Sequence, residues 1–218
     1  MQFPDARIIV FAKPPIPGKA KTRLIPVLGG QGASELHARL VRHTLTTATQ
    51  ADLCPVELYC ADQQQHPFFA ECQQDFPVTL KLQHGADLGA RMANAFDQAL
   101  RASSHVILIG SDCPALTATD LEQALDALIT GQDCVLKPAA DGGYVLIGLS
   151  KLNRAIFSDI DWGSDQVLRQ TQAKLKAINW RWQELETTWD LDRPEDLIKL
   201  QNPQLKHLIS SGIYPASI

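Results

Sequence analysis

The chain has 218 residues, of which 45% are hydrophobic, and a formal net charge of −4 with a pI near 5.8. This length can bury a sizeable core, and the composition is ordinary for a globular protein. The negative charge argues against nucleic-acid binding through bulk positive charge, and no apolar run approaches the roughly 20 residues needed to span a bilayer. We therefore expect one globular domain over residues 1–218, with no nucleic-acid partner and no membrane span.

The five cysteines form no C-x-x-C pair, and no histidine cluster completes a zinc site. The odd count, together with an N-terminus that lacks the pattern of a signal peptide, predicts reduced thiols and a cytoplasmic location. Cys113 lies next to Asp112 and raises the alternative of a cysteine nucleophile, although no candidate base lies nearby in sequence.

Short apolar runs alternate with helical patterns along the chain. The runs predicted as strands cover residues 7–12, 56–60, 79–82, 106–109, 134–137 and 144–149, and residues 180–185 alternate as a further candidate. Apolar residues recur at helical spacing in residues 34–50, 88–100, 121–129 and 167–175. Strands that alternate with helices predict βαβ units, so we expect an α/β fold with a mainly parallel sheet.

The strand at residues 106–109 runs directly into Gly110-Ser111-Asp112-Cys113-Pro114. Ligands of open α/β sheets collect at the carboxyl ends of the strands, where the glycine and the proline would hold Asp112 in a fixed bend. A carboxylate at that point is suited to holding a divalent cation against phosphate oxygens. The alternative is that Asp112 caps a helix that begins near Thr117 or Thr119.

The loop after the first strand, residues 13–24, contains three prolines, one glycine and four cations, which are Lys13, Lys19, Lys21 and Arg23. It leaves the same sheet edge as Asp112, and its stiffness and charge predict a phosphate-binding loop. Its spacing matches neither the Walker A nor the Rossmann glycine pattern. The alternative is a solvated basic loop.

Other segments combine acids with glycines. Asp87 either caps a helix or borders a base or sugar, in a segment that continues through Gly89 and Arg91. Residues 141–144 form either an ordinary turn or a close approach of the backbone to a ligand, and residues 161–164 have the same ambiguity.

The segment from Trp189 to Leu197 carries four acids within seven residues. Glu195 and Asp196 follow Pro194 at a predicted helix start, where acidic side chains are favourable. Asp190 and Asp192 would share one side of an extended chain, and one of them could complete a cation site with Asp112.

Taken in order, these motifs resemble the bacterial glycosyltransferase-A-like proteins of the DUF2064 family. The resemblance spans about residues 8–197, and its motifs lie at residues 11–14, 17–19, 21–24, 87–92, 110–114, 141–144 and 162–164. It implies a nucleotide-diphospho-sugar transferase fold, a three-layer sandwich with a mainly parallel sheet.

The wider superfamily implies roles for individual residues. Lys13 with residues 20–24 is similar to the phosphate-binding loop of 2-phospholactate guanylyltransferases. Residues 190–197 look like the late motif of sugar nucleotidyltransferases, in which the acid two before the proline helps to bind magnesium. The resemblance therefore implies Asp112 and Asp192 as ligands of Mg²⁺ or Mn²⁺. In one departure, prolines replace several glycines of the nucleotidyltransferase loop, which argues against use of a nucleoside triphosphate.

The leading hypothesis is a metal-dependent transferase that moves a glycosyl group from a nucleotide sugar to a small-molecule acceptor. The candidate catalytic residues are Asp112, Lys21 and Arg23. The candidate nucleotide- and phosphate-binding residues are Lys13, Lys19, Lys21, Arg23, Asp87, Gly89 and Arg91, and those on the acceptor side are Asp141, Gly142, Gly143 and Tyr144.

Two alternatives stand beside it: nucleotidyl transfer from a nucleoside triphosphate to a phosphorylated acceptor, and a non-catalytic nucleotide-binding homologue. The apolar stripe of residues 202–218, which includes Leu205, Leu208 and Ile213, packs either on its own chain or on a second copy. Monomer and homodimer are both compatible with this pattern.

Overall fold

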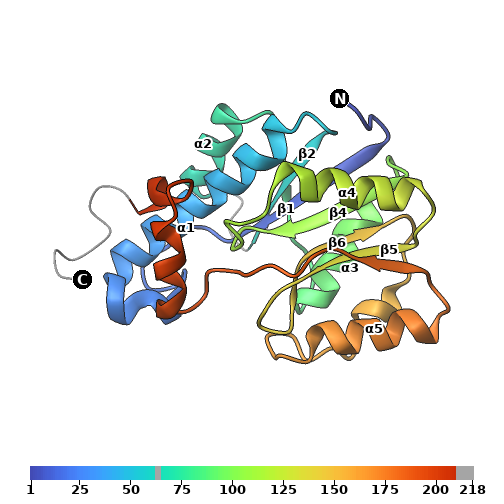
Figure 1. Cartoon of the computed structure of the whole chain (residues 1–218). Coiled ribbons are helices and arrows are strands. Elements are labelled where there is room, and N and C mark those ends of the chain that lie inside the picture. The colour runs from blue at the N-terminus through green and yellow to red at the C-terminus, as the bar shows by residue number, and fades with distance from the viewer. Residues whose placement is uncertain (62–64, 210–218) are drawn as a thin grey trace.

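The computed structural model describes residues 1–61 and 65–209. Within these residues, seven strands form a sheet in the order β3-β2-β1-β4-β6-β5-β7 (Figure 1). The strands are β1 Ala6–Ala12, β2 Val56–Cys60, β3 Val78–Leu82, β4 His105–Gly110, β5 Cys134–Pro138, β6 Tyr144–Leu149 and β7 Trp182–Glu184. The first six lie where apolar runs predicted strands, and β7 lies within the alternating segment of residues 180–185.

The sheet is mainly parallel, as predicted. Strands β1 to β4 run parallel to one another and β7 runs parallel to β5, whereas β6 is antiparallel to both β4 and β5. The reversal follows from the connection, because the short turn at residues 139–143 joins β5 to β6 and a parallel crossover needs a much longer segment.

Helices cover both faces of the sheet and give the expected three layers (Figure 1). The α-helices are α1 Ile25–Gln50, α2 Pro67–Asp75, α3 Leu88–Ala99, α4 Ala118–Ile129 and α5 Val167–Ala177. The 3-10 helices are η1 Thr22–Leu24, η2 Arg154–Phe157, η3 Pro194–Gln201 and η4 Lys206–Leu208. Side chains of α1, α2 and α4 pack on one face, and those of α3 and α5 on the other.

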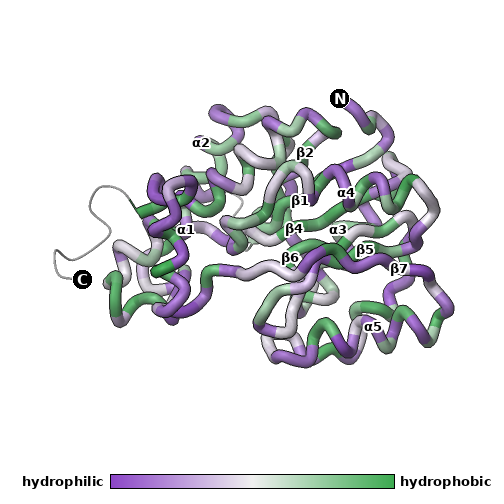
Figure 2. Tube along the Cα trace, in the orientation of Figure 1, coloured by the Kyte–Doolittle hydropathy of each residue, from purple (hydrophilic) through white to green (hydrophobic). Residues whose placement is uncertain are grey.

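Strand β1 shows how the layers are specified. Ile8 and Val10 belong to the core under α1, α2 and α4, whereas Ile9 and Phe11 belong to the core above α3 and α5. Successive side chains point to opposite faces, so a strand covered on both sides needs a continuous apolar run. Figure 2 shows this as hydrophobic colour concentrated on the central strands.

The structure differs from the sequence predictions in two helices. Helix α1 begins at Ile25, well before residue 34, and Gly29 within it has a positive φ of 67° that interrupts the helical geometry. This kink separates the predicted apolar stripe from the first turns. Helix α2 was not predicted; it is short and buries only Phe68, Phe69 and Cys72.

A third core cluster joins the first half of α1 to the C-terminal 3-10 helices (Figure 1). Leu205 and Leu208 are buried in it, so this part of the apolar tail packs on its own chain. Ile213 lies outside the described residues. In the part of the chain that the structure covers, no helix combines the length and the apolar character needed to cross a membrane.

A buried ion pair fastens α4 to the sheet. The Lys137 side chain of β5 is only 5% exposed, and its Nζ donates to Asp120 Oδ1 at 2.7 Å and to the Glu186 carbonyl oxygen at 3.0 Å. Asp120 also completes the capping box of α4 with Thr117. One carboxylate therefore both caps the helix and neutralises a buried ammonium.

Replacing Asp120 by Ala should lower the free energy of unfolding by about 3 kcal/mol or more, because it removes a cap and leaves Lys137 buried without its counter-ion. The double variant with Lys137→Met should recover part of that loss. Urea denaturation measures both, with Asp126→Ala on the exposed side of α4 as the control, expected within about 0.5 kcal/mol of wild type. Additive costs in the double variant would contradict the coupling.

Candidate functional site

The cationic loop and Asp112 meet at a cavity of about 700 Å³ at the carboxyl ends of β1 and β4. This phosphate-side cavity is lined by most of the residues singled out in the sequence: Lys13, Lys19, Lys21, Arg23, Asp87, Arg91, Asp112 and Asp192. The edge of the sheet is the one predicted, because β1 and β4 are parallel neighbours and end together.

Lys21 is the central cation of this cavity. Its backbone adopts a left-handed conformation (φ 47°, ψ 47°), and its side chain is only 4% exposed. The ammonium lies 2.8 Å from Asp112 Oδ1 and also donates to the carbonyl oxygen of Leu191. One buried charge thus joins three segments that are far apart in sequence.

The segment before η3 is fixed beside the turn after β4. The backbone N–H of Leu191 donates to the Asp112 carbonyl oxygen at 2.8 Å. The next residue, Asp192, pairs through its carboxylate with the Arg23 guanidinium. Each of the two predicted metal ligands therefore faces one of the two predicted catalytic cations.

The electrostatics favour an ionised Asp112. Desolvation by the surrounding protein raises the pKa of this carboxyl, but Lys21 and His37 lower it further than burial raises it, and the net pKa lies well below the ordinary value. Asp112 is half exposed to the cavity, so the carboxylate is both ionised and accessible.

His37 is a site residue that the sequence analysis missed. It is buried in α1, its Nε2 lies 3.0 Å from the Lys13 carbonyl oxygen, and its Nδ1 lies 3.8 Å from Asp112 Oδ1. It therefore bridges the cationic loop and the carboxylate. The available signal was a histidine next to Leu36, on the apolar side of a helix that follows the loop.

Asp190 and Asp192 have separate surroundings. Asp192 lines the phosphate-side cavity, whereas Asp190 lies close to Asp141. Burial, followed by the charge of Asp141, raises the pKa of Asp190 above its ordinary value. Of the two acids, Asp192 is the one that lines the same cavity as Asp112.

Asp87 at the entry to α3 is a helix cap and also a cavity-lining residue. Asp87 Oδ1 accepts from the Ala90 backbone N–H at 2.8 Å, which makes it the N-cap of the helix, and Asp87 also lines the cavity. Gly89 lies instead against the Phe157 carbonyl and the Trp162 ring, where a Cβ would come within 2.7 Å of both. Its absent side chain permits close packing.

The predicted acceptor side forms a second cavity of about 210 Å³. Asp141, Gly143 and Tyr144 line this smaller cavity. Gly142 lies behind the wall with a φ of +90°, and a Cβ added there would overlap the Asp165 carbonyl oxygen. The turn is thus fixed by backbone packing.

Two alternative interpretations fail on geometry. Thr117, together with Asp120, caps α4, so the interpretation of Asp112 as that cap is wrong. Cys113 is buried with its Sγ 3.8 Å from Thr188 Oγ1, and burial raises the pKa of its thiol. A buried, protonated thiol is a poor nucleophile. All five cysteines are unpaired.

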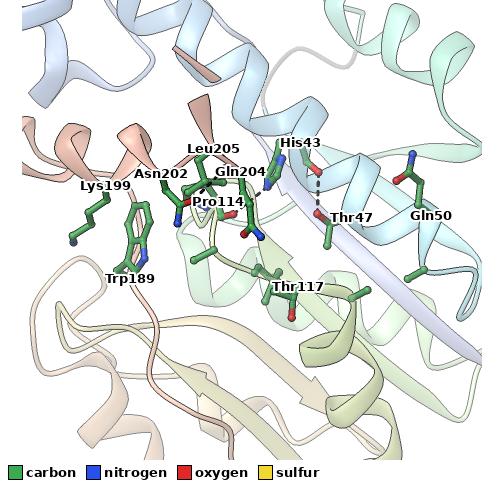
Figure 3. A pocket seen from close by; sticks show the side chains of 14 residues that line it. His43, Thr47, Gln50, Pro114, Thr117, Trp189, Lys199, Asn202, Gln204 and Leu205 are labelled. Atoms are coloured by element: carbon green, nitrogen blue, oxygen red, sulfur yellow. Dashed lines mark hydrogen bonds between the residues drawn. The ribbon is translucent and has the colours of Figure 1, made fainter. Parts of the chain in front are cut away.

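Another cavity, of about 580 Å³, lies between α1, the Pro114 turn and the C-terminal segment (Figure 3). Figure 3 shows Trp189 and Lys199 on one side of it and His43 and Thr47 on the other. Lys199 Nζ lies 4.7 Å from the Trp189 ring centroid. None of the residues predicted to bind phosphate or metal lines this cavity.

The donor set at the phosphate-side cavity suits a magnesium or manganese ion that is shared with a substrate. Within residues 1–61 and 65–209, no group of three or more His, Cys, Asp or Glu side chains is placed to hold a metal ion. Asp112 and Asp192 provide hard carboxylate oxygens at one cavity. Magnesium in phosphate-transfer sites is typically held by one or two carboxylates and completed by substrate phosphates and water.

Comparison with known proteins identifies the family. The family model described as "Uncharacterized protein conserved in bacteria (DUF2064)" matches residues 44–164, more than half of the chain, and this protein therefore belongs to that family. No curated protein matches the chain.

Solved structures share the fold. A candidate nucleotide-diphospho-sugar transferase from Desulfovibrio desulfuricans G20 is similar with a TM-score of 0.83 and 26% identity, over 95% of this chain and 94% of that one. CMP:2-keto-3-deoxy-manno-octonic acid synthetase complexed with CTP has a TM-score of 0.58 and 15% identity, over 93% and 99%. Rv0371c from Mycobacterium tuberculosis H37Rv in complex with manganese has a TM-score of 0.52 and 16% identity, over 91% and 98%.

These similarities confirm the predicted fold and family. The first of these neighbours is named as a nucleotide-diphospho-sugar transferase, in agreement with the enzyme class predicted from the sequence.

Replacing Lys21 by Met should raise the pKa of Asp112 in metal-free protein, because the ammonium that opposes desolvation is lost. In the wild type, the lowered pKa contributes stability above the unfolded pKa of about 4, and this contribution is lost as pH falls below about 5. The free energy of unfolding should therefore fall less in Lys21→Met than in wild type between about pH 6 and pH 3. Urea denaturation across this range measures it. The exposed Lys19→Met is the control, and equal pH dependence in both variants would contradict the assignment.

Gly142 and Gly163 have nearly equal φ values, so replacing each by Ala separates the cost of backbone strain from the cost of a steric clash. Gly163→Ala at φ +89° meets no atom within 4 Å and should cost about 1–2 kcal/mol, the left-handed conformational penalty. Gly142→Ala at φ +90° adds a clash with the Asp165 backbone and should cost at least about 1 kcal/mol more. Chemical denaturation of the two variants measures the difference. Equal costs would show that the turn relaxes around the added methyl group.

Proposed function

We propose that this DUF2064 protein is a divalent-metal-dependent transferase that moves a glycosyl group from a nucleotide sugar to a small-molecule acceptor. One observation carries the proposal: at a single cavity, the cations Lys21 and Arg23 are paired with the carboxylates Asp112 and Asp192. These are the charges required by a metal–pyrophosphate ligand, which offers positive charge to carboxylates and negative charge to cations.

The ion pairs make metal and nucleotide binding interdependent. Without ligand, each carboxylate neutralises a cation, so a metal ion or a nucleotide arriving alone competes with an existing ion pair. In a metal–nucleotide complex, the metal ion can replace the cation beside each carboxylate while the phosphates replace the carboxylate beside each cation. We therefore expect the metal ion to increase the affinity for the nucleotide, and the nucleotide to increase the affinity for the metal ion.

The remaining residues take complementary roles. Asp112 and Asp192 would hold Mg²⁺ or Mn²⁺, which supplies a Lewis acid beside the phosphates. Lys13, Lys19, Lys21 and Arg23 would neutralise the charge that grows on the nucleoside diphosphate as its bond to the sugar breaks and the acceptor oxygen bonds to the anomeric carbon. Asp87 and Arg91 would border the base or ribose.

Nucleotidyl transfer is the second candidate, and the number of cations favours it. Five cations line the phosphate-side cavity, the four of the loop and Arg91, which is enough to neutralise a triphosphate. In that reaction a phosphorylated acceptor attacks the α-phosphate and pyrophosphate leaves. The likeness to a synthetase complexed with CTP supports the same possibility at the level of fold. A non-catalytic nucleotide-binding homologue would need neither Asp112 nor Asp192.

A thermal-shift panel of nucleotide sugars and nucleoside triphosphates, with and without Mg²⁺ or Mn²⁺, tests the proposal. A metal-dependent rise in Tm with a nucleotide sugar is the expected result. Calorimetry should then show that Asp112→Asn and Asp192→Asn each weaken the metal-dependent binding by about tenfold or more, a loss of at least about 1.4 kcal/mol. Asp159→Asn is the matched control, since its side chain is 89% exposed and lies outside the cavity.

The other outcomes separate the rival functions. A shift confined to one triphosphate would favour nucleotidyl transfer. Nucleotide binding that is indifferent to metal, in the wild type and in both aspartate variants, would favour the non-catalytic homologue. An unchanged Tm with every nucleotide at millimolar concentration would contradict all three.

A further inference from the structure

The smaller cavity differs in chemistry from the phosphate-side cavity. Its volume is about 210 Å³, and its wall is built mainly from apolar and aromatic side chains: Phe11, Leu88, Met92, Leu108, Tyr144, Val145, Ile147, Trp162 and Val167. None of the four loop cations reaches it. Electrostatic binding of a second phosphate therefore does not explain it.

Two polar side chains on this wall accept hydrogen bonds from the backbone of the protein. Asp141 Oδ1 accepts from the Gly143 backbone N–H at 2.9 Å, and Ser164 Oγ accepts from that of Gln166 at 3.2 Å. The Tyr144 hydroxyl is buried beside Thr171 of α5. The surface offered to a ligand is accordingly mainly apolar, with the exposed Asp141 carboxylate as its charged group.

Such a wall suits a ring and disfavours a sugar. A sugar's hydroxyl groups lose their water on entry and need replacement hydrogen bonds, whereas an apolar ring gains from the transfer. A dry apolar cavity of about 150 Å³ accommodates benzene, so a volume of about 210 Å³ suits one substituted ring.

The two cavities adjoin, and Gly110 lies between them. Phe11, Leu88 and Gly110 line both. A Cβ built at Gly110 would meet no atom within 4 Å, so the absent side chain leaves open space at the junction. A single ligand can therefore extend from the cationic cavity into the apolar one.

We propose that the small cavity is a subsite for an apolar, ring-sized group carried by the acceptor. The identification of the ligand as the acceptor rests on the proposed function, whereas the subsite itself is inferred from the residues that line the cavity. The ring would lie against Trp162, Tyr144 and Met92, and its reactive end would point past Gly110 toward the phosphate-side cavity.

Three probes test the subsite without knowledge of the true substrate: phenyl phosphate, glucose 1-phosphate and inorganic phosphate, measured by calorimetry. All three offer a phosphate to the cationic cavity, and only the first offers an apolar ring. Phenyl phosphate should bind at least about tenfold more tightly than the other two, because burial of the ring removes on the order of 100 Å² of apolar surface from water.

Two variants assign that preference to the cavity. Gly110→Val should fill the junction without a clash in the fold, and Leu88→Asn should make its 44% exposed rim polar. Each should reduce phenyl phosphate binding to the level of inorganic phosphate measured in the same variant. Ile129→Asn, which replaces a 47% exposed residue outside both cavities, is the matched control and should retain the preference.

Equal or tighter binding of glucose 1-phosphate would overturn the inference, as would a phenyl phosphate preference that survives in both variants. The test is independent of the nucleotide panel. If nucleotides fail to bind while the ring preference holds, the proposed function fails and the apolar subsite stands. If nucleotides bind with metal while the ring preference is absent, only the subsite is lost.

Discussion

The site depends on one buried ammonium group. Lys21 holds the cationic loop against Asp112 and against the carbonyl of Leu191, so segments from three parts of the chain meet around a single charge. A buried charge is tolerated only when it is paired and hydrogen-bonded, and these partners meet that requirement. Lys21 also has a left-handed backbone conformation, which is uncommon for a residue other than glycine.

This arrangement balances the charge of the site. The positive loop and the negative turns neutralise each other when no ligand is bound, and Asp112 remains ionised because Lys21 and His37 offset its desolvation. The same pairing keeps both sets of charges in position for a ligand that carries both signs. Next to this charged region, the small apolar cavity offers surface of the opposite character within reach of the same ligand.

Much of the fold followed from local pattern. Runs such as Ile8–Val10 and Val106–Ile109 are apolar at every position because both faces of their strands are covered, and the glycine and proline around Asp112 marked a fixed turn. Helix α2 and the early start of α1 were missed because short or kinked helices give weak periodicity. The contacts that His37 and Lys21 make with Asp112 and Leu191 were beyond prediction, since they join residues 75 to 170 positions apart in sequence.

The reversed strand β6 has a consequence for how the site is assembled. In an all-parallel sheet, each strand would present only its exit to the functional edge. Because β6 runs the other way, its first residue, Tyr144, enters the sheet at that edge beside the exit of β4. The wall of the small cavity is therefore built partly by an incoming chain whose preceding turn, residues 139–143, is anchored at both ends by strands. The cationic loop leaves this edge from β1, whereas part of the wall of the small cavity arrives at it through β6, so two separate segments of the chain supply the charged and the apolar surfaces.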